Sequence, residues 1–157
     1  MSERGRKYGA EGIVVYYQPR LCIHAAECVR GLPEVFDTQK KPWIQPEHAA
    51  ADAISEVVER CPSGALHYER LDGGQAEAVP QFVSADLMPD GPLYLRGPMA
   101  FRNDSGAVTF ETARAALCRC GASRNKPFCD NSHLEAGFKA AHVRIALEIV
   151  PGKVGEL

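Results

Sequence analysis

The sequence has no long hydrophobic run, and neither sign of charge dominates it. No apolar segment approaches the roughly 20 residues that a membrane-spanning helix needs. The first residues, MSERGRKYGAEG, are charged and contain no apolar core, so no signal peptide is expected. The formal net charge of -2 argues against nucleic acid or an anionic membrane as a partner. These absences favour a cytoplasmic protein.

The sequence also lacks the motifs of common enzymes. We find no phosphate-binding glycine loop, no Ser-His-Asp arrangement and no internal repeat. Nothing supplies a nucleophile, a general base or a site for an organic cofactor, so we expect no enzyme and assign no catalytic residue. The length of 157 residues, 45% of them apolar, suits one domain or two small ones.

Cysteine is the residue type that the chain does carry in a pattern. Six cysteines fall into two triplets, each with its own spacing. Disulfides need an oxidising compartment, and nothing here directs export. Metal or cluster ligation in a reducing compartment is therefore the better explanation for both triplets.

The C-terminal triplet lies in the stretch C-R-C-G-A-S-R-N-K-P-F-C-D-N-S-H, which starts at Cys118 and ends at His133. Its Gly, Ser, Asn and Pro residues favour a loop. A loop that gathers three thiols and an imidazole usually binds metal. Zinc favours C-x(2–4)-C pairs, whereas the first pair here is C-x-C. In a 2Fe–2S cluster, Cys118 and Cys120 would bind one iron, and Cys129 and His133 the other. A structural Cys3His zinc site stays open as the alternative.

This stretch resembles the CDGSH iron–sulfur domain, the group that includes mitoNEET, and the resemblance covers roughly residues 91 to 138. It implies a 2Fe–2S cluster and, because single-motif CDGSH proteins are typically intertwined dimers, a homodimer. The ligands that it implies are Cys118, Cys120, Cys129 and His133. Matching residues around them, which we expect to support the ligands, are Lys126, Asp130 and Ser132. Asn131 stands where the family usually has Gly, and Asn is among the best substitutes where φ is positive.

The N-terminal triplet comprises Cys22, Cys28 and the remote Cys61, which is followed by proline. A C-x5-C pair closed by a distant C-P is part of the bacterial ferredoxin run C-x2-C-x2-C…C-P. The middle cysteine of that run is replaced here by Ala25.

Residues 11 to 69 resemble the single-cluster ferredoxins that serve bacterial haem monooxygenases. The matching segments are the Cys22–Cys28 pair, P-E-V-F-D and C-P-S-G-A-L. In such ferredoxins, a non-cysteine residue at the middle position accompanies a 3Fe–4S cluster bound by three thiolates. The resemblance thus implies that Cys22, Cys28 and Cys61 are the ligands. His24 would supply a fourth ligand if the cluster were 4Fe–4S, and would otherwise be a loop residue near the cluster.

Hydrophobic patterns predict an α+β fold. The two resemblances imply a small ferredoxin-like N-terminal half and a β-rich CDGSH-type C-terminal half. We expect a ferredoxin-like domain at 1–72, a CDGSH-type domain at 82–141 and a C-terminal strand or tail at 142–157. Residues 71–81 read as a linker. A helix is expected from Pro46 to Cys61, with a helical turn after His133 capped by Asp130 or Ser132. The expected strands span residues 11–17, 65–69, 93–96, 107–110 and 142–150.

The cysteine spacings together with the two resemblances imply a one-electron carrier with a 3Fe–4S (or 4Fe–4S) centre and a Cys3His-ligated 2Fe–2S centre. Its partners would be redox proteins, with no nucleic acid and no membrane. One alternative is a cluster-transfer or redox-sensing protein, whose partners would be cluster-accepting apo-proteins. A weaker alternative is a zinc-binding structural adapter.

Overall fold

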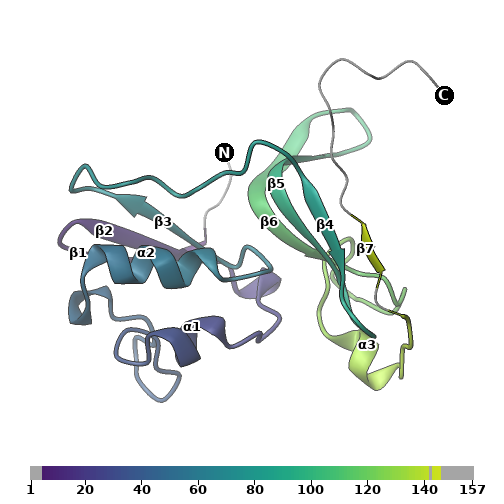
Figure 1. The fold of residues 1–157 in the computed structure, drawn as a ribbon, viewed down its shortest axis with the longest axis horizontal. Coiled ribbons are helices and arrows are strands. Elements are labelled where there is room, and N and C mark those ends of the chain that lie inside the picture. Colours follow the sequence, from purple (N-terminus) through teal and green to yellow (C-terminus); the bar gives the residue numbers. More distant parts are fainter. Residues whose placement is uncertain (1–4, 142, 146–157) are drawn as a thin grey trace.

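The computed structural model describes residues 5–141 and 143–145. Two antiparallel sheets stand side by side (Figure 1), one of three strands and one of four, and short helices accompany both. The α+β class predicted from the sequence is confirmed. Among the described residues, no helix combines the length and the apolar character that a membrane crossing requires.

The first sheet has the order β1-β2-β3 and is formed by β1 (Arg6–Ala10), β2 (Ile13–Tyr17) and β3 (Leu66–Arg70). The two strands expected at 11–17 and 65–69 are present as β2 and β3, and they pair antiparallel. β1 was not predicted, because its sequence RKYGA shows no alternation of apolar and polar residues.

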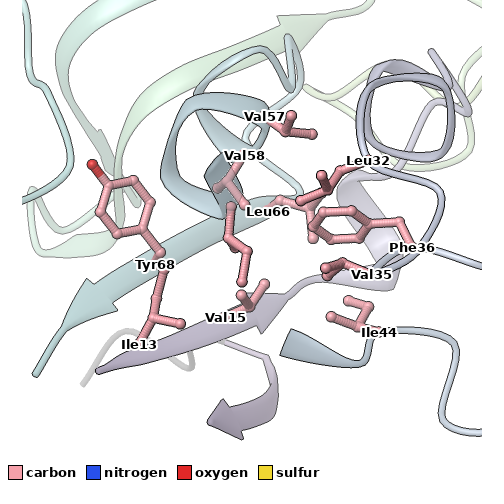
Figure 2. Close-up of a cluster of buried hydrophobic side chains, with 11 residues drawn as sticks. Ile13, Val15, Leu32, Val35, Phe36, Ile44, Val57, Val58, Leu66 and Tyr68 are labelled. Atoms are coloured by element: carbon pink, nitrogen blue, oxygen red, sulfur yellow. The ribbon is translucent and has the colours of Figure 1, made fainter. Parts of the chain in front are cut away.

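Helix α2 (Ala51–Glu59) covers one face of this sheet, and the main hydrophobic core lies between them (Figure 2). Val15 from β2, Val58 from α2 and Phe36 from the intervening loop are almost fully buried there.

The helix predicted from Pro46 to Cys61 is wrong at both ends. Its start is a separate 3-10 turn, η2 (Pro46–His48), because the backbone extends at Ala49. At the other end, Cys61 lies beyond the last turn of α2.

The second sheet has the order β6-β5-β4-β7, with antiparallel pairing throughout. Its strands are β4 (Ser84–Leu87), β5 (Leu93–Arg102), β6 (Val108–Leu117) and β7 (Val143–Ile145). β5 and β6 extend well beyond the short strands predicted at 93–96 and 107–110, and β4 was not predicted. β7 falls inside the strand expected at 142–150, whose other residues lie outside the described part.

Arg114 of β6 fastens the two sheets together. Its side chain is 3% exposed and enters the N-terminal part of the chain. The guanidinium donates hydrogen bonds to the carbonyls of Val58 (2.5 Å), Cys61 (2.9 Å) and Leu66 (2.7 Å), and to the carboxylate of Glu77. One side chain from the second sheet therefore holds the end of α2, the beginning of β3 and the connecting segment.

The connecting segment 71–81 contains no helix or strand, as its composition predicted. It is nevertheless anchored, because Glu77 also lies 2.9 Å from Nδ1 of His67 on β3. Burial acts to raise the pKa of Glu77, but His67 and Arg114 lower it below its ordinary value of 4.5. An ionised carboxylate thus joins the segment to both sheets.

Candidate metal centres

The three N-terminal cysteines meet at one cavity of about 560 Å³. Cys22 follows the 3-10 turn η1 (Pro19–Leu21), Cys28 lies in the short helix α1 (Glu27–Gly31), and Cys61 follows α2. His24 and Ala26 have positive φ angles of 54° and 64°, so the loop between the first two cysteines curls tightly. All three sulfur-bearing residues line the cavity, as the spacing predicted.

Burial and neighbouring sulfur keep the proton on the Cys28 thiol. The pKa of Cys28 is raised to about 11, first by burial and then by Cys61 and Cys22, against an opposing backbone N–H from Val29. Tyr17, which also lines the cavity, has its pKa raised by burial and by Cys22 and Cys28. Because the thiolate and not the thiol binds metal, metal binding at Cys28 should release its proton.

His24 lies at the edge of the same cavity but is exposed. Its Nδ1 is 4.0 Å from the sulfur of Cys22, the nearest ligand candidate. This position is compatible with a loop residue beside three cysteine ligands and with a fourth ligand. The choice between 3Fe–4S and 4Fe–4S therefore stays a prediction.

The C-terminal donors form two separate pairs. The sulfurs of Cys118 and Cys120 are 3.7 Å apart, and Nδ1 of His133 lies 3.6 Å from the sulfur of Cys129. Two thiolates bound to one tetrahedral metal at about 2.3 Å are about 3.8 Å apart. Each pair is thus spaced to share one metal atom.

The pairs do not merge into a single-ion site. Within residues 5–141 and 143–145, no three His, Cys, Asp or Glu side chains converge as one metal ion would require. The two-pair arrangement fits a group with two metal atoms, such as a 2Fe–2S rhomb, better than one tetrahedral zinc ion. None of the six cysteines, all of which lie in the described part, forms a disulfide.

Backbone N–H groups point at the sulfurs of the C-terminal loop. Ala122 N donates to the sulfur of Cys120, and Asn131 N to that of Cys129, both at 3.4 Å. Burial acts to raise the pKa of Cys118, but backbone N–H groups, that of Ser123 first, lower it. Such donors stabilise negative charge on sulfur, as an iron–sulfur group requires.

The residues expected to support these ligands hold the loop in shape rather than face the donors. Asp130 accepts hydrogen bonds from the backbone N–H groups of Arg124 (2.9 Å) and Ser132 (3.0 Å). The side-chain hydroxyl of Ser132, followed by these backbone N–H groups, keeps the pKa of Asp130 below its ordinary value. The ammonium of Lys126 donates to Ser123 O at 2.9 Å.

A helical turn does follow Asp130, as α3 (Ser132–Glu135), but its predicted cap is wrong. The cap residue is Asn131, which has a left-handed backbone with φ of 70° and makes no side-chain capping bond. The positive φ agrees with the expectation that Asn replaces Gly at this position.

Sequence reasoning missed the segment that covers His133. A Cβ on Gly91 would lie 3.8 Å from Nε2 of His133, so the turn before β5 packs over the imidazole. Arg119, between two ligand candidates, donates to Gly91 O at 2.8 Å and to Met88 O at 2.5 Å. The Asp90-Gly91-Pro92 turn was recognisable from sequence, but its place over His133 depends on the fold.

The donor sets of both sites suit iron–sulfur clusters, and comparison with known proteins supports an iron–sulfur protein. The family model described as "Divergent 4Fe-4S mono-cluster" matches residues 8–71, and the one described as "Iron-binding zinc finger CDGSH type" matches residues 90–134. The chain is similar to "Uncharacterized protein YjdI" of Escherichia coli strain K12, with 41% identity over 63 residues. These residues make up 40% of this chain and 83% of that protein. The YjdI protein of Escherichia coli O157:H7 matches to the same extent.

The chain therefore belongs to the divergent mono-cluster 4Fe-4S family, and it carries a CDGSH-type iron-binding domain after that part. Both resemblances stated from sequence are confirmed.

Proposed function

We propose that this iron–sulfur protein is a one-electron carrier with two different clusters. The N-terminal ligands would be Cys22, Cys28 and Cys61, holding a 3Fe–4S cluster, or a 4Fe–4S cluster if a fourth ligand joins. The C-terminal ligands would be Cys118, Cys120, Cys129 and His133, holding a 2Fe–2S cluster. When bound, such clusters supply reversible one-electron chemistry.

One observation carries this proposal: the two ligand loops pack directly against each other. Ile23, which follows Cys22, forms a buried group with Ala116 and Cys129. Tyr94 packs against this group, and its pKa is raised by burial, then by Cys129 and Cys61, one residue from each site. Two redox sites in contact within one chain suit a carrier that receives an electron at one surface and gives it up at another.

The chain's own residues would tune the two sites differently. At the C-terminal site, backbone N–H groups reach the sulfurs of Cys120 and Cys129, which favours more negative charge there. The neutral imidazole of His133 in place of a thiolate acts in the same direction, because it leaves the cluster less negative and raises its reduction potential. At the N-terminal site, the basic residues Arg6, Lys40 and Lys41 also line the cavity.

Cluster transfer is the second candidate function, and the surface around His133 favours it. His133 is half-buried, and its neighbour Leu134 is 71% exposed. As the one donor of the set that is not a thiolate, the half-buried imidazole should be displaced more readily than the cysteine ligands. The zinc-adapter alternative uses the same donors and differs from both cluster proposals in the metal that the purified protein would contain.

The test is to reduce the cluster-loaded protein stepwise and then mix it with an apo-ferredoxin. A carrier takes up and returns one electron per cluster over repeated cycles, and keeps its iron during the mixing. Movement of iron to the apo-ferredoxin without reversible reduction would overturn the carrier proposal in favour of transfer. Purified protein that contains zinc alone would overturn both.

A further inference from the structure

One residue touches both ligand loops. Asn131 lies between Cys129 and His133, and its backbone N–H donates to the sulfur of Cys129 at 3.4 Å. Its side-chain amide donates to Ile23 O at 2.9 Å, across to the loop that carries Cys22. Any movement of the C-terminal ligand loop is thus transmitted to the backbone next to the first N-terminal cysteine.

A second asparagine strengthens the same junction. The side-chain amide of Asn125 donates to Arg20 O at 2.7 Å. Arg20 belongs to the 3-10 turn η1, in which Cys22 N bonds to Pro19 O at 3.2 Å. The C-terminal loop therefore binds two carbonyls that lie on either side of Cys22.

Burial beneath these hydrogen bonds makes the junction a packed contact. Ile23 is 8% exposed, Ala116 is 2% exposed and Cys129 is 4% exposed, and the three contact one another. A buried contact between two loops has few alternative arrangements, because the surrounding atoms are close-packed. Order gained in one loop therefore reaches the other.

We infer that Asn131 is a positioning residue that couples the two ligand sites, so that loading one site slows loss of the metal group from the other. This inference rests on the proposed function, since it requires that both sites bind clusters. When the C-terminal donors are bound, the 129–133 loop is fixed and Asn131 holds Ile23 in place. Coupling of binding free energies is reciprocal, so the N-terminal site must change the affinity of the C-terminal site by the same factor, although the two release rates need not change equally.

The side chain of Asn131 can be removed without disturbing its backbone. Asn131→Gly keeps the positive φ at no steric cost and keeps the N–H that reaches Cys129, but it removes the amide that reaches Ile23. Glycine is also the residue that the CDGSH resemblance implies for this position, so the C-terminal site should still form. Asn103→Gly is the matched control, because Asn103 binds only within its own turn between β5 and β6 in the bonds recorded for it.

The experiment compares four full-length proteins. They are wild type, Asn131→Gly, a variant with Cys118→Ser and Cys120→Ser, and a variant with all three changes. The two serine substitutions empty the C-terminal site. Iron release from the N-terminal site to a chelator is followed by its own absorption and EPR signals. Emptying the C-terminal site should speed this release at least about fivefold in the Asn131 background, the lower end of ordinary site coupling. In the Gly background the effect should be clearly smaller, because only the Asn125 bond and the buried contact of Ile23 with Cys129 remain.

Hydrogen exchange supplies a readout that does not depend on cluster signals. Amides of residues 20–26 should exchange about fivefold faster in Asn131→Gly than in wild type, the effect of one lost hydrogen bond. Asn103→Gly should leave them unchanged. Equal release rates with the C-terminal site full or empty, or unchanged exchange in Asn131→Gly, would overturn the coupling. Absence of iron from the N-terminal triplet in wild type would instead overturn the proposed function.

Discussion

Replacing Arg114 by alanine should destabilise both halves of the protein, although the residue belongs to the second sheet. Its guanidinium is the only group that the described hydrogen bonds show reaching Val58 O, Cys61 O and Glu77 together. Alanine leaves the buried carboxylate and the carbonyls without this donor. Because Cys61 is one of the three N-terminal ligand candidates, its site should also become less stable.

The size of the effect follows from burial. The side chain of Arg114 is 3% exposed and that of Glu77 is 14% exposed, so screening by water is weak. Removing one partner of a buried ion pair typically costs about 3–5 kcal/mol. His67 remains 2.9 Å from Glu77 and can compensate in part, which places the expectation near the lower end. At about 1–3 kcal/mol per molar urea, a loss of about 3 kcal/mol lowers the unfolding midpoint by about 1–3 M.

The assay is urea unfolding of the loaded protein, followed by the fluorescence of Trp43, the chain's single tryptophan, and by cluster absorption. Arg96→Ala is the control, because Arg96 is exposed and donates to Glu59 O at 3.2 and 3.3 Å. The urea midpoint of Arg96→Ala should differ little from that of wild type. If Arg114→Ala shifts the midpoint no more than this control does, the buried guanidinium is not what fastens the sheets.

Three further predictions concern single residues. His24→Ala should leave the N-terminal iron content and EPR signal intact, whereas His133→Ala should lose C-terminal iron; equal loss at both sites would make His24 a ligand. The folded-state pKa of Glu77 is lowered from 4.5, so its contribution to stability is complete above 4.5 and is lost as pH falls through the folded value. The urea midpoints of wild type and Glu77→Gln should therefore differ at pH 7 and converge in acid, and a gap independent of pH would contradict this. Gly64→Ala should cost about 1–3 kcal/mol in thermal or urea unfolding, since the new Cβ would lie 2.2 Å from Arg114 O at a φ of 69°; an unchanged midpoint would show that the junction can relax.

The ligand candidates could be predicted from the sequence, because the C-terminal donors of each pair lie close together along the chain. Cys118 and Cys120 are two residues apart, and Cys129 and His133 are four apart, so chain connectivity alone nearly determines each pair. The structure places these pairs at 3.7 and 3.6 Å. The C-P dipeptide at Cys61 led us to group this residue with Cys22, and both residues line the same cavity in the structure.

The junction between the two halves could not be predicted from the sequence, because it consists of contacts between residues far apart along the chain. Arg114 reads as a polar residue within a strand, and nothing near it in sequence identifies Val58 or Glu77 as a partner. Asn131 was recognised for its backbone, since asparagine tolerates positive φ, but its amide reaches Ile23, 108 residues earlier. β1 was missed for a related reason: its place comes from pairing with β2 rather than from its own pattern.

The central claim is that two different clusters occupy this one chain, and the iron content together with EPR of the aerobically purified protein tests it most directly. We predict about five iron atoms per chain, three at the N-terminal site and two at the C-terminal site, with a 3Fe–4S signal in the oxidised state and a second signal on reduction. About six iron atoms with a 4Fe–4S signal on reduction would keep two clusters and assign the N-terminal site a fourth ligand. Two iron atoms per chain, or zinc in place of iron, would contradict the account.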